Sequence, residues 1–499
     1  FLGYCPHAPE SRAVLERFLR YTIPRIRDLR ALHSICLSNE PILTNVQSCP
    51  LARANWHAWL QRRHGTLEKL NEAWQTQYTS LDEIPLPPPV FRPSPIVYDF
   101  VRYNQEEHAA WHRFMADIIH ELAPQIPVHA QMMICAVFGP ETHGPWSIAP
   151  ELFAPFCEIN GNDAWRVWLG DAGEWATAWQ QEIMGYELQR CAREAPVFNS
   201  EDHIIADRNI SWQPPEYIYN VYWQGAVHGR GASSAWVWER SNDLVSDFTG
   251  SILHRPECVE AAGRCTLDLN RLAEQVTALQ KVKPQVALIY ALSGFVWDPG
   301  YPEAMAAVYR AGVFGGYKVG FVSERQLEAW SGGGRPAEYL SDLKVIICPG
   351  LRHLSASAQE GLAKFAAAGG KVFAWPGLPE ADEYDRPLAV LSTPAASLQA
   401  QDEAELVEAL RAAVAGCGVP LPVKLTGPDD KLLYGVEYFA APFEGGWVIN
   451  VSNYRSAAVS AKLFVDGREV AQATELISGR PLRGTLQVPS LQPLLIFVR

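Results

Sequence analysis

The sequence lacks any apolar run of the roughly 18 residues that a helix needs to cross a bilayer. The longest apolar runs, at 285–292 and 343–348, have the length of buried strands. Basic residues are also in deficit, because 42 Lys and Arg stand against 55 Asp and Glu and the formal net charge is −13. The basic side chains are scattered rather than clustered, so no broad positive field exists to neutralise phosphates. We therefore expect neither a membrane span nor a nucleic-acid partner.

The start of the given sequence offers no pattern that predicts a targeting signal. Its first residue is Phe1, and no charged region followed by an apolar stretch precedes the first helical segment. The ten cysteines lie far apart and form no CxxC pair. Such spacing favours reduced, mostly buried thiols and hence a cytoplasmic location, although the N-terminus itself is uninformative. We expect no cofactor.

Length and composition indicate several packed units. A chain of 499 residues, 48% of them hydrophobic, is long enough for about three domains of roughly 150 residues each. The 17 tryptophans are unusual. Flat apolar rings suit the faces of sugar rings, but large cores also use Trp, so composition alone leaves both interpretations open.

The first half of the chain repeats a helix followed by a short apolar strand, the pattern of parallel βα units. A helix at 10–29 precedes the first strand, and the predicted strands lie near 33–38, 127–133, 158–163, 196–200 and 232–238. Five strands are too few for a closed barrel. The sheet is therefore either an open doubly wound one or strands 4–8 of a (β/α)8 TIM barrel. A start without Met favours the second reading, in which an upstream segment completes the barrel.

Two further units follow. Val-, Ile- and Leu-rich strands at 285–291, 317–321, 343–348 and 371–375 alternate with helices at 302–312 and 356–368, which indicates a second α/β domain. Beyond Pro422, short alternating strands with Gly-containing turns indicate a small antiparallel β domain. We thus expect a barrel domain over 1–275, an α/β domain over 284–420 and a β domain over 425–499.

Two acidic residues end strands of the predicted barrel. Glu40 ends ICLSNE and Glu201 ends VFNSE, each where its side chain can face the barrel axis. In barrel enzymes the chemistry lies at the carboxyl ends of the strands. Hydrolysis of a glycoside with retention needs two carboxyl groups roughly 5 Å apart, one as nucleophile and one as acid and then base. Either glutamate alone could be an ordinary surface residue, but the pair predicts this chemistry.

Three motifs carry a family resemblance: NEP at 39–41, HGTLEKLNEAW at 64–74 and NSEDH at 199–203. Together they resemble glycoside hydrolase family 42, the β-galactosidases of the large barrel clan, and HGTLEKLNEAW is the most specific of them. The resemblance implies that the middle domain is an amidotransferase-like, flavodoxin-like trimerisation domain and that the last is a β-sandwich. It also implies a homotrimer that hydrolyses a small oligosaccharide or glycoside.

By the same resemblance Glu40 is the acid/base, Glu201 is the nucleophile and Asn39 binds the sugar 2-hydroxyl. Trp212, in RNISW, occupies the place of a Trp that packs against the galactose. Trp165 falls where the family has a Tyr that touches the nucleophile. For Trp165, and for Trp238 at the end of the last barrel strand, a core role and a sugar-binding role both stay open.

The sequence departs from the family pattern at two places. After the last barrel strand the family has a Glu and a His that hold galactose, whereas the best alignment here gives Ser246 and Thr249. The nearest acids are Asp243 and Asp247, of which Asp247 is the candidate for substrate binding. Galactose specificity is therefore open, with β-glucosides, β-fucosides and α-L-arabinopyranosides as alternatives.

The family's zinc site is also incomplete. Many members hold zinc with four cysteines, and only Cys5 and Cys49 lie at suitable places here. Two thiols do not make a structural zinc site, so we expect no metal.

Two other functions compete with the glycosidase. In an amidotransferase-like enzyme Cys348 would be the nucleophile and His353 its base, but no Gly-x-Cys-x-Gly elbow is present. In a carbohydrate-binding or assembly protein, a truncated barrel would have lost catalysis while both glutamates remained.

Overall fold

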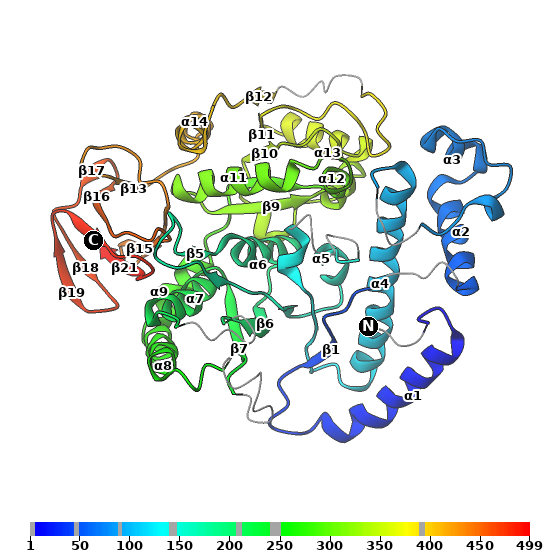
Figure 1. Ribbon diagram of the computed structural model, residues 1–499, viewed down its shortest axis with the longest axis horizontal. Coiled ribbons are helices and arrows are strands. Elements are labelled where there is room, and N and C mark those ends of the chain that lie inside the picture. Colours follow the sequence, from blue (N-terminus) through cyan, green and yellow to red (C-terminus); the bar gives the residue numbers. More distant parts are fainter. Residues whose placement is uncertain are drawn as a thin grey trace.

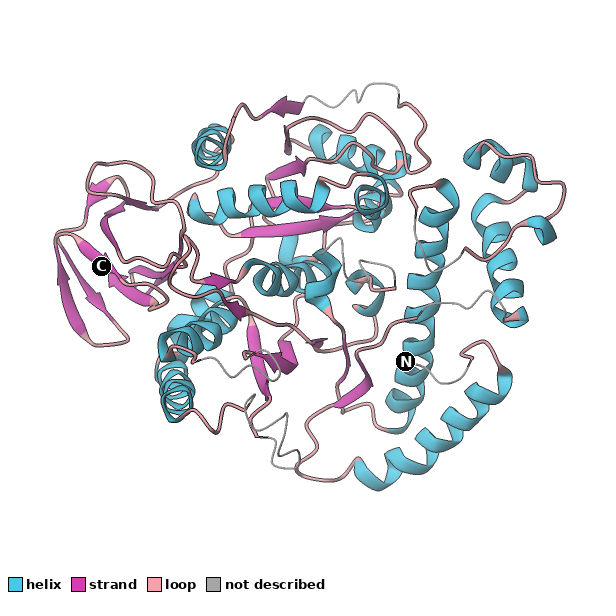
Figure 2. Cartoon of the chain, viewed as in Figure 1, coloured by secondary structure: helices cyan, strands magenta, loops and turns pink. Residues whose placement is uncertain are grey.

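The computed structural model describes residues 5–43, 49–87, 92–138, 147–205, 212–239, 251–388 and 395–499. Figure 1 shows the N-terminal helices at one end, the C-terminal strands at the other and two parallel sheets between them. Figure 2 shows that helices dominate the first part and strands the last. Within the described residues every helix is too short or too polar to span a bilayer.

The first sheet is a run of five parallel strands in the order β1-β2-β3-β6-β7. A bridge between Met132 and Asn162 joins its two parts. The strands are β1 (Ile35–Asn39), β2 (Val128–Gln131), β3 (Asn160–Asn162), β6 (Val197–His203) and β7 (Arg230–Trp236). All five lie where the sequence predicts them. Over the described residues this sheet does not close, so a complete barrel is absent and only its parallel arc is present.

Helices cover this arc and extend beyond it. They are α1 (Pro9–Ile26), α2 (Pro50–His64), α3 (Leu67–Trp74), α4 (Pro95–Leu122), α5 (Pro150–Phe153), α6 (Gln180–Ala192), α7 (Pro215–Val227), α8 (Pro256–Arg271) and α9 (Ala273–Gln280). Short 3-10 turns lie at Leu81–Glu83 and Ile134–Phe138, and a hairpin joins β4 (Val167–Trp168) to β5 (Thr177–Ala178). Pro begins α1, α2, α4, α5, α7 and α8, which suits the first helical turn because Pro has no backbone N–H to leave unpaired.

The HGTLEKLNEAW motif has a structural role in this fold. The Thr66 side chain caps α3 by accepting a hydrogen bond from the Lys69 backbone N–H. His64 Nε2 and Trp74 Nε1 each lie 2.8 Å from the same oxygen of Asp99, which is fully buried on α4. The Tyr384 hydroxyl donates to Asp99 as well, at 3.0 Å. The motif therefore ties α2 and α3 to α4 and to the second sheet's layer.

The second sheet is parallel and its strand order is β12-β11-β10-β8-β9. Its strands are β8 (Val286–Tyr290), β9 (Val319–Ser323), β10 (Val345–Pro349), β11 (Lys371–Trp375) and β12 (Ala395–Ser397). Its helices are α10 (Leu292–Trp297), α11 (Tyr301–Phe314), α12 (Glu324–Ser331), α13 (Ala356–Ala367) and α14 (Glu403–Gly416), with a 3-10 turn at Glu338–Leu340. Numbered within the unit the order is 2-1-3-4-5, which flavodoxin-like sheets share. One continuous apolar cluster joins this sheet to the first.

The last part forms two antiparallel sheets. One contains β13 (Val423–Thr426), β16 (Val459–Val465), β17 (Arg468–Glu469) and β20 (Leu486–Val488). The other contains β14 (Val436–Phe443), β15 (Gly446–Asn453), β18 (Gln472–Glu475), β19 (Arg480–Arg483) and β21 (Leu494–Val498). Alternating apolar side chains from both sheets share one small core. The boundaries expected at 275, 284, 420 and 425 stay predictions.

A buried ionic cluster joins the three parts. His228, after α7, lies 2.9 Å from a carboxylate oxygen of Glu187 on α6 and 2.7 Å from one of Glu437 on β14. Lys318, before β9, lies 3.7 Å from Glu187, and the Tyr339 hydroxyl donates to Glu187 at 2.9 Å. The side chains that form these ion pairs are each at most 3% exposed. Charges buried this deeply are tolerated only when each has a partner.

We therefore predict that Glu437→Ala lowers the free energy of unfolding by about 3–5 kcal/mol, because it leaves a buried histidine facing an empty site. Denaturant unfolding followed by fluorescence measures the change. Glu469→Ala, an exposed carboxylate on β17 of the same β part, is the control and is expected to change stability by less than about 0.5 kcal/mol. Equal losses in the two variants would contradict the role of the cluster.

Candidate active site

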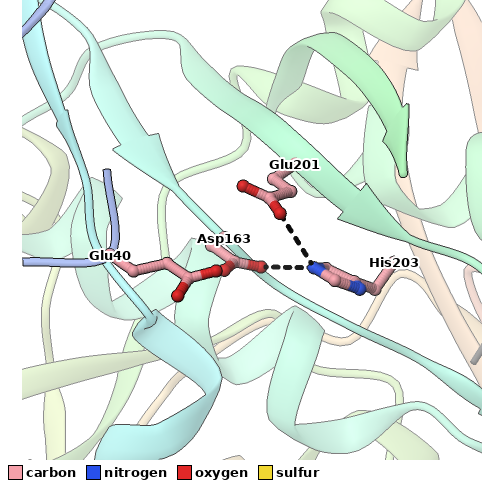
Figure 3. A group of neighbouring side chains, drawn as sticks. All are labelled: Glu40, Asp163, Glu201 and His203. Atoms are coloured by element: carbon pink, nitrogen blue, oxygen red, sulfur yellow. Dashed lines mark ion pairs between the residues drawn. The ribbon is translucent and has the colours of Figure 1, made fainter. Parts of the chain in front are cut away.

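Four polar side chains converge at the carboxyl ends of the first sheet's strands (Figure 3). Glu40 directly follows β1, Asp163 directly follows β3, and Glu201 and His203 belong to β6. One polar atom of each lies within 4.8 Å of one from every other. This is the edge of a parallel sheet where barrel enzymes and open α/β enzymes place their chemistry.

The distance between Glu40 and Glu201 matches one class of glycoside hydrolysis. An oxygen of one lies within 4.8 Å of an oxygen of the other. Retaining enzymes hold their carboxyl groups about 5–5.5 Å apart, whereas inverting enzymes leave about 6.5–9.5 Å for a water molecule. The gap is therefore suited to direct attack by a carboxylate on the anomeric carbon.

The backbone at Glu40 is in an uncommon conformation. Its φ is +42°, in the left-handed region that non-glycine residues rarely adopt. Such conformations persist where surrounding structure enforces them, and they concentrate at functional sites. Here the turn directs Glu40 out of the end of β1 toward Asp163, as Figure 3 shows.

Glu201 has contacts that stabilise a negative carboxylate. It is 7% exposed, the Gln131 side-chain amide of β2 donates a hydrogen bond to its Oε2, and His203 Nε2 lies 3.6 Å from its Oε1. Donors aimed at a carboxylate favour its charged form. A buried and fixed carboxylate is what a nucleophile requires.

Asp163 is a third carboxyl group in the same space. It is 2% exposed, it hydrogen-bonds the Glu40 carboxyl, and its Oδ1 lies 3.3 Å from His203 Nε2. Burial, the hydrogen bond to Glu40 and the charge of Glu201 together raise the pKa of Asp163 to about 8. At neutral pH this carboxyl therefore retains its proton.

The alternation of side chains along β6 explains why Glu201 and His203 reach the site together. Residues two apart on a strand share a face. Asn199, earlier on β6, exchanges hydrogen bonds with the backbone of Ala164 and so fixes the segment after β3. Asp202 points the other way, where it accepts hydrogen bonds from Arg230 and Ser233.

The remaining predicted residues are spread around this centre. Asn39 is exposed and pairs in register with Gln131, and Trp165 is half-buried beside His203 through a backbone bridge. Trp212 and Trp238 are 60% and 44% exposed, and the Trp212 ring meets Trp168 edge-on. Asp247, with its neighbours Asp243, Ser246 and Thr249, lies outside the described residues.

Sequence reasoning missed Asp163, His203 and Gln131. Each lies at or just past the carboxyl end of a predicted strand, which is the signal that identified Glu40 and Glu201. Many of the tryptophans belong instead to the interior: Trp56, Trp111, Trp179 and Trp223 are among the largest fully buried side chains.

Cys348 and His353 do not form the nucleophile and base of an amidotransferase-like enzyme. Both ring nitrogens of His353 are engaged by carboxylates, Nδ1 by Asp298 at 2.6 Å and Nε2 by Asp385 at 2.8 Å. Cys348 is completely buried in β10, and burial raises the pKa of its thiol to about 12. A thiol of this kind is a poor nucleophile. Cys5 and Cys49 lie with their sulfur atoms 3.5 Å apart.

Comparisons with known proteins give matches to β-galactosidases. Residues 3–152 match the family model of glycoside hydrolase family 42, described as beta-galactosidase. The beta-galactosidase bgaB of Geobacillus kaustophilus is 24% identical over 396 residues, which cover 74% of this chain and 54% of that protein. The beta-galactosidase of Thermus thermophilus is 30% identical over 300 residues, which cover 55% of this chain and 44% of that protein. The chain thus spans about half the length of these curated relatives.

Solved structures share the fold. The family 42 exo-carrageenase of Bacteroides ovatus has a TM-score of 0.85 at 21% identity and covers 99% of this chain and 70% of its own. The beta-galactosidase of Bacillus circulans sp. alkalophilus has a TM-score of 0.74 at 16% identity and covers 99% and 83%. The chain therefore has the fold of TIM-barrel glycosidases with additional domains, although no sheet closes within its described residues.

Asp163 allows a test of the site's electrostatics. Because the folded protein holds this proton up to about pH 8 while an unfolded Asp releases it near its ordinary value of 3.8, the native state binds more protons in between. The free energy of unfolding that this residue contributes therefore falls as pH rises from about 4 to about 8. We predict that Asp163→Asn raises the melting temperature, with a gain that grows over this window and is constant above it. Thermal melts at several pH values measure this, with the exposed Asp171→Asn as control. A gain independent of pH would contradict the prediction.

Proposed function

This chain is a relative of the family 42 glycoside hydrolases, and from that premise we propose that it is a retaining β-glycosidase, in the first place a β-galactosidase. Glu40 is the general acid/base and Glu201 the nucleophile. The observation that carries the proposal is the gap of at most 4.8 Å between oxygens of these two residues, contributed by separate strands.

The mechanism is a double displacement. Glu201, held by Gln131 and His203, attacks the anomeric carbon while Glu40 protonates the leaving oxygen. A glycosyl ester of Glu201 results. Glu40, now a carboxylate, takes a proton from water as the water attacks the same carbon, and Glu201 is released.

Substrate contacts are proposed for the residues around this centre. Asn39 is exposed beside Glu40 and binds the sugar 2-hydroxyl, and the exposed rings of Trp212 and Trp238 offer apolar faces to a sugar. Trp165, beside His203, is a candidate wall of the same site. Asp247 stays a candidate for binding the sugar's polar edge.

The sugar and the linkage are the open part of the proposal. β-Glucosides, β-fucosides and α-L-arabinopyranosides are alternative substrates. Carrageenan fragments should also be tested as substrates, because the exo-carrageenase of Bacteroides ovatus has the same fold. A carbohydrate-binding protein without catalysis is the second candidate function, favoured by the open sheet in the described residues.

The assembly is also proposed. We infer that the α/β layer is a trimerisation domain of the flavodoxin or amidotransferase type and that the protein is a homotrimer. Within the described residues β1 pairs only with β2, and Cys36 and Asn39 on it are exposed. Such an unpaired edge suits a further strand, so we propose that an upstream segment pairs there and completes the barrel.

We predict that Glu201→Gln reduces the hydrolysis of aryl β-glycosides to background, because the amide cannot form the ester. Glu40→Gln should lower kcat/KM about 10²–10⁴-fold for alkyl glycosides, and much less for dinitrophenyl glycosides, whose leaving group needs no proton. Release of phenol measures turnover for the aryl substrates, and release of the free sugar measures it for the alkyl ones. Proton NMR of the first product should show the β-anomer. An α-anomer as first product would rule out retention, and sugar binding without turnover would favour the second candidate function.

A further inference from the structure

We propose that Asp163 and Glu40 share one proton, and that His203 couples this pair to Glu201, so that Asp163 positions the proton that Glu40 delivers. The inference rests on the proposed glycosidase function but assigns a residue that the paired-glutamate mechanism does not include. Asp163 acts through Glu40, so it is a positioning residue rather than a catalytic one.

The first observation is the contact between two carboxyl groups. An oxygen of Asp163 lies within 4.8 Å of an oxygen of Glu40, and Figure 3 shows their carboxyl groups facing one another. A carboxylate has only acceptor oxygens, so two carboxyl groups can form a hydrogen bond only when one of them carries a proton. Because Asp163 is buried and Glu40 is partly exposed, charge on the pair is better tolerated at Glu40 and the proton at Asp163.

The second observation is the position of His203. Its Nε2 lies 3.3 Å from Asp163 Oδ1 and 3.6 Å from Glu201 Oε1, between the pair and the nucleophile. A single ring N–H can therefore turn toward whichever of these two oxygens is negative. Within the described residues the buried Oδ1 of Asp163 accepts no hydrogen bond of ordinary geometry, so it is open to such an approach.

The charged groups around Asp163 come from each neighbouring strand. Glu40 follows β1, while Glu201, Asp202 and His203 belong to β6. Arg230 of β7 is bound to Asp202 on the opposite face of β6, which directs its charge away from the site. Burial of Asp163, together with these negative neighbours, raises its pKa, so a proton is retained there.

The proposal accounts for every proton and charge in the reaction. In the first step the glycosidic C–O bond breaks, a C–O bond to Glu201 forms, and the shared proton goes to the leaving oxygen. Glu201 is then a neutral ester, the pair is fully ionised, and the N–H of His203 can turn to Asp163. In the second step water attacks, its proton returns to the pair, the ester bond breaks and Glu201 regains its charge.

The test is the pH profile and leaving-group dependence of Asp163→Asn in the full chain. Asn keeps the shape and donates a hydrogen bond to Glu40, but it holds no exchangeable acid proton. We expect kcat/KM for alkyl glycosides to fall about 100-fold, and for dinitrophenyl glycosides by less than about threefold. The alkaline limb of the profile should move down by about one pH unit, because the amide stabilises ionised Glu40.

Asp202→Asn is the matched control, since it removes a neighbouring buried carboxylate of β6 that does not contact Glu40. It should affect both leaving groups equally. Melting curves establish that each variant is folded, and Asp163→Ser replaces Asp163→Asn if the latter is not. His203→Gln should reproduce the selective loss on alkyl glycosides more weakly.

A readout that needs no turnover separates this inference from the proposed function. Infrared spectra of the wild type near neutral pH should contain the carbonyl stretch of a protonated carboxyl group, and Asp163→Asn should lack it. An inactive wild type, or an active Glu201→Gln, would overturn the glycosidase and leave the infrared band to decide proton sharing. An active wild type whose band persists in Asp163→Asn, or an equal loss on both leaving groups, would overturn proton sharing alone.

Discussion

Three carboxyl groups within a few ångströms of one another are the constraint on which the site depends. Two unit charges 4 Å apart repel by about 4 kcal/mol at an effective dielectric constant of 20, so Glu40, Asp163 and Glu201 cannot all be ionised cheaply. Only His203 and the amide of Gln131 offset them from close range in the described structure. The site resolves the repulsion by retaining a proton. The proposed acid/base chemistry on a sugar needs such a proton next to a fixed carboxylate. The proton that lowers the repulsion is therefore the one that the reaction would use.

The rest of the fold holds these three carboxyl groups in place. Over the described residues the first sheet is an open arc, and its strands would be poorly supported without the layer that packs on them. Asp99 is satisfied jointly by His64, Trp74 and Tyr384, so a buried charge links the N-terminal helices to the second sheet's layer. The cluster at His228 links the arc to the β part in the same way. Both links leave few ways to shift one part without exposing or unpairing a charge.

The sequence predicted the strands well, because apolar runs bounded by polar residues and Pro are a local signal. It also made Glu40 and Glu201 candidates for the site, since each ends such a run, and their roles stay predictions. It did not single out Asp163 or His203, although each also lies at the end of a strand, because their significance is pairwise. Asp163 matters only if the end of β3 lies beside the end of β1, and no local pattern encodes that proximity. The tryptophan count left two interpretations open for a related reason, since a buried Trp56 and an exposed Trp212 are indistinguishable by composition.

The two glutamates differ in how firmly they are held, and this difference fits their proposed roles. Glu201 lies within β6, between paired strands, with a donor on each side. Glu40 follows β1, which pairs only with β2 in the described part of the chain, and it has a left-handed backbone and partial exposure. A nucleophile must stay within bonding distance of one carbon, whereas an acid/base must reach first a leaving oxygen and then a water molecule. The contact with Asp163 restrains the position of the Glu40 side chain, which β1 holds less firmly. This restraint comes from a shared proton rather than from packing.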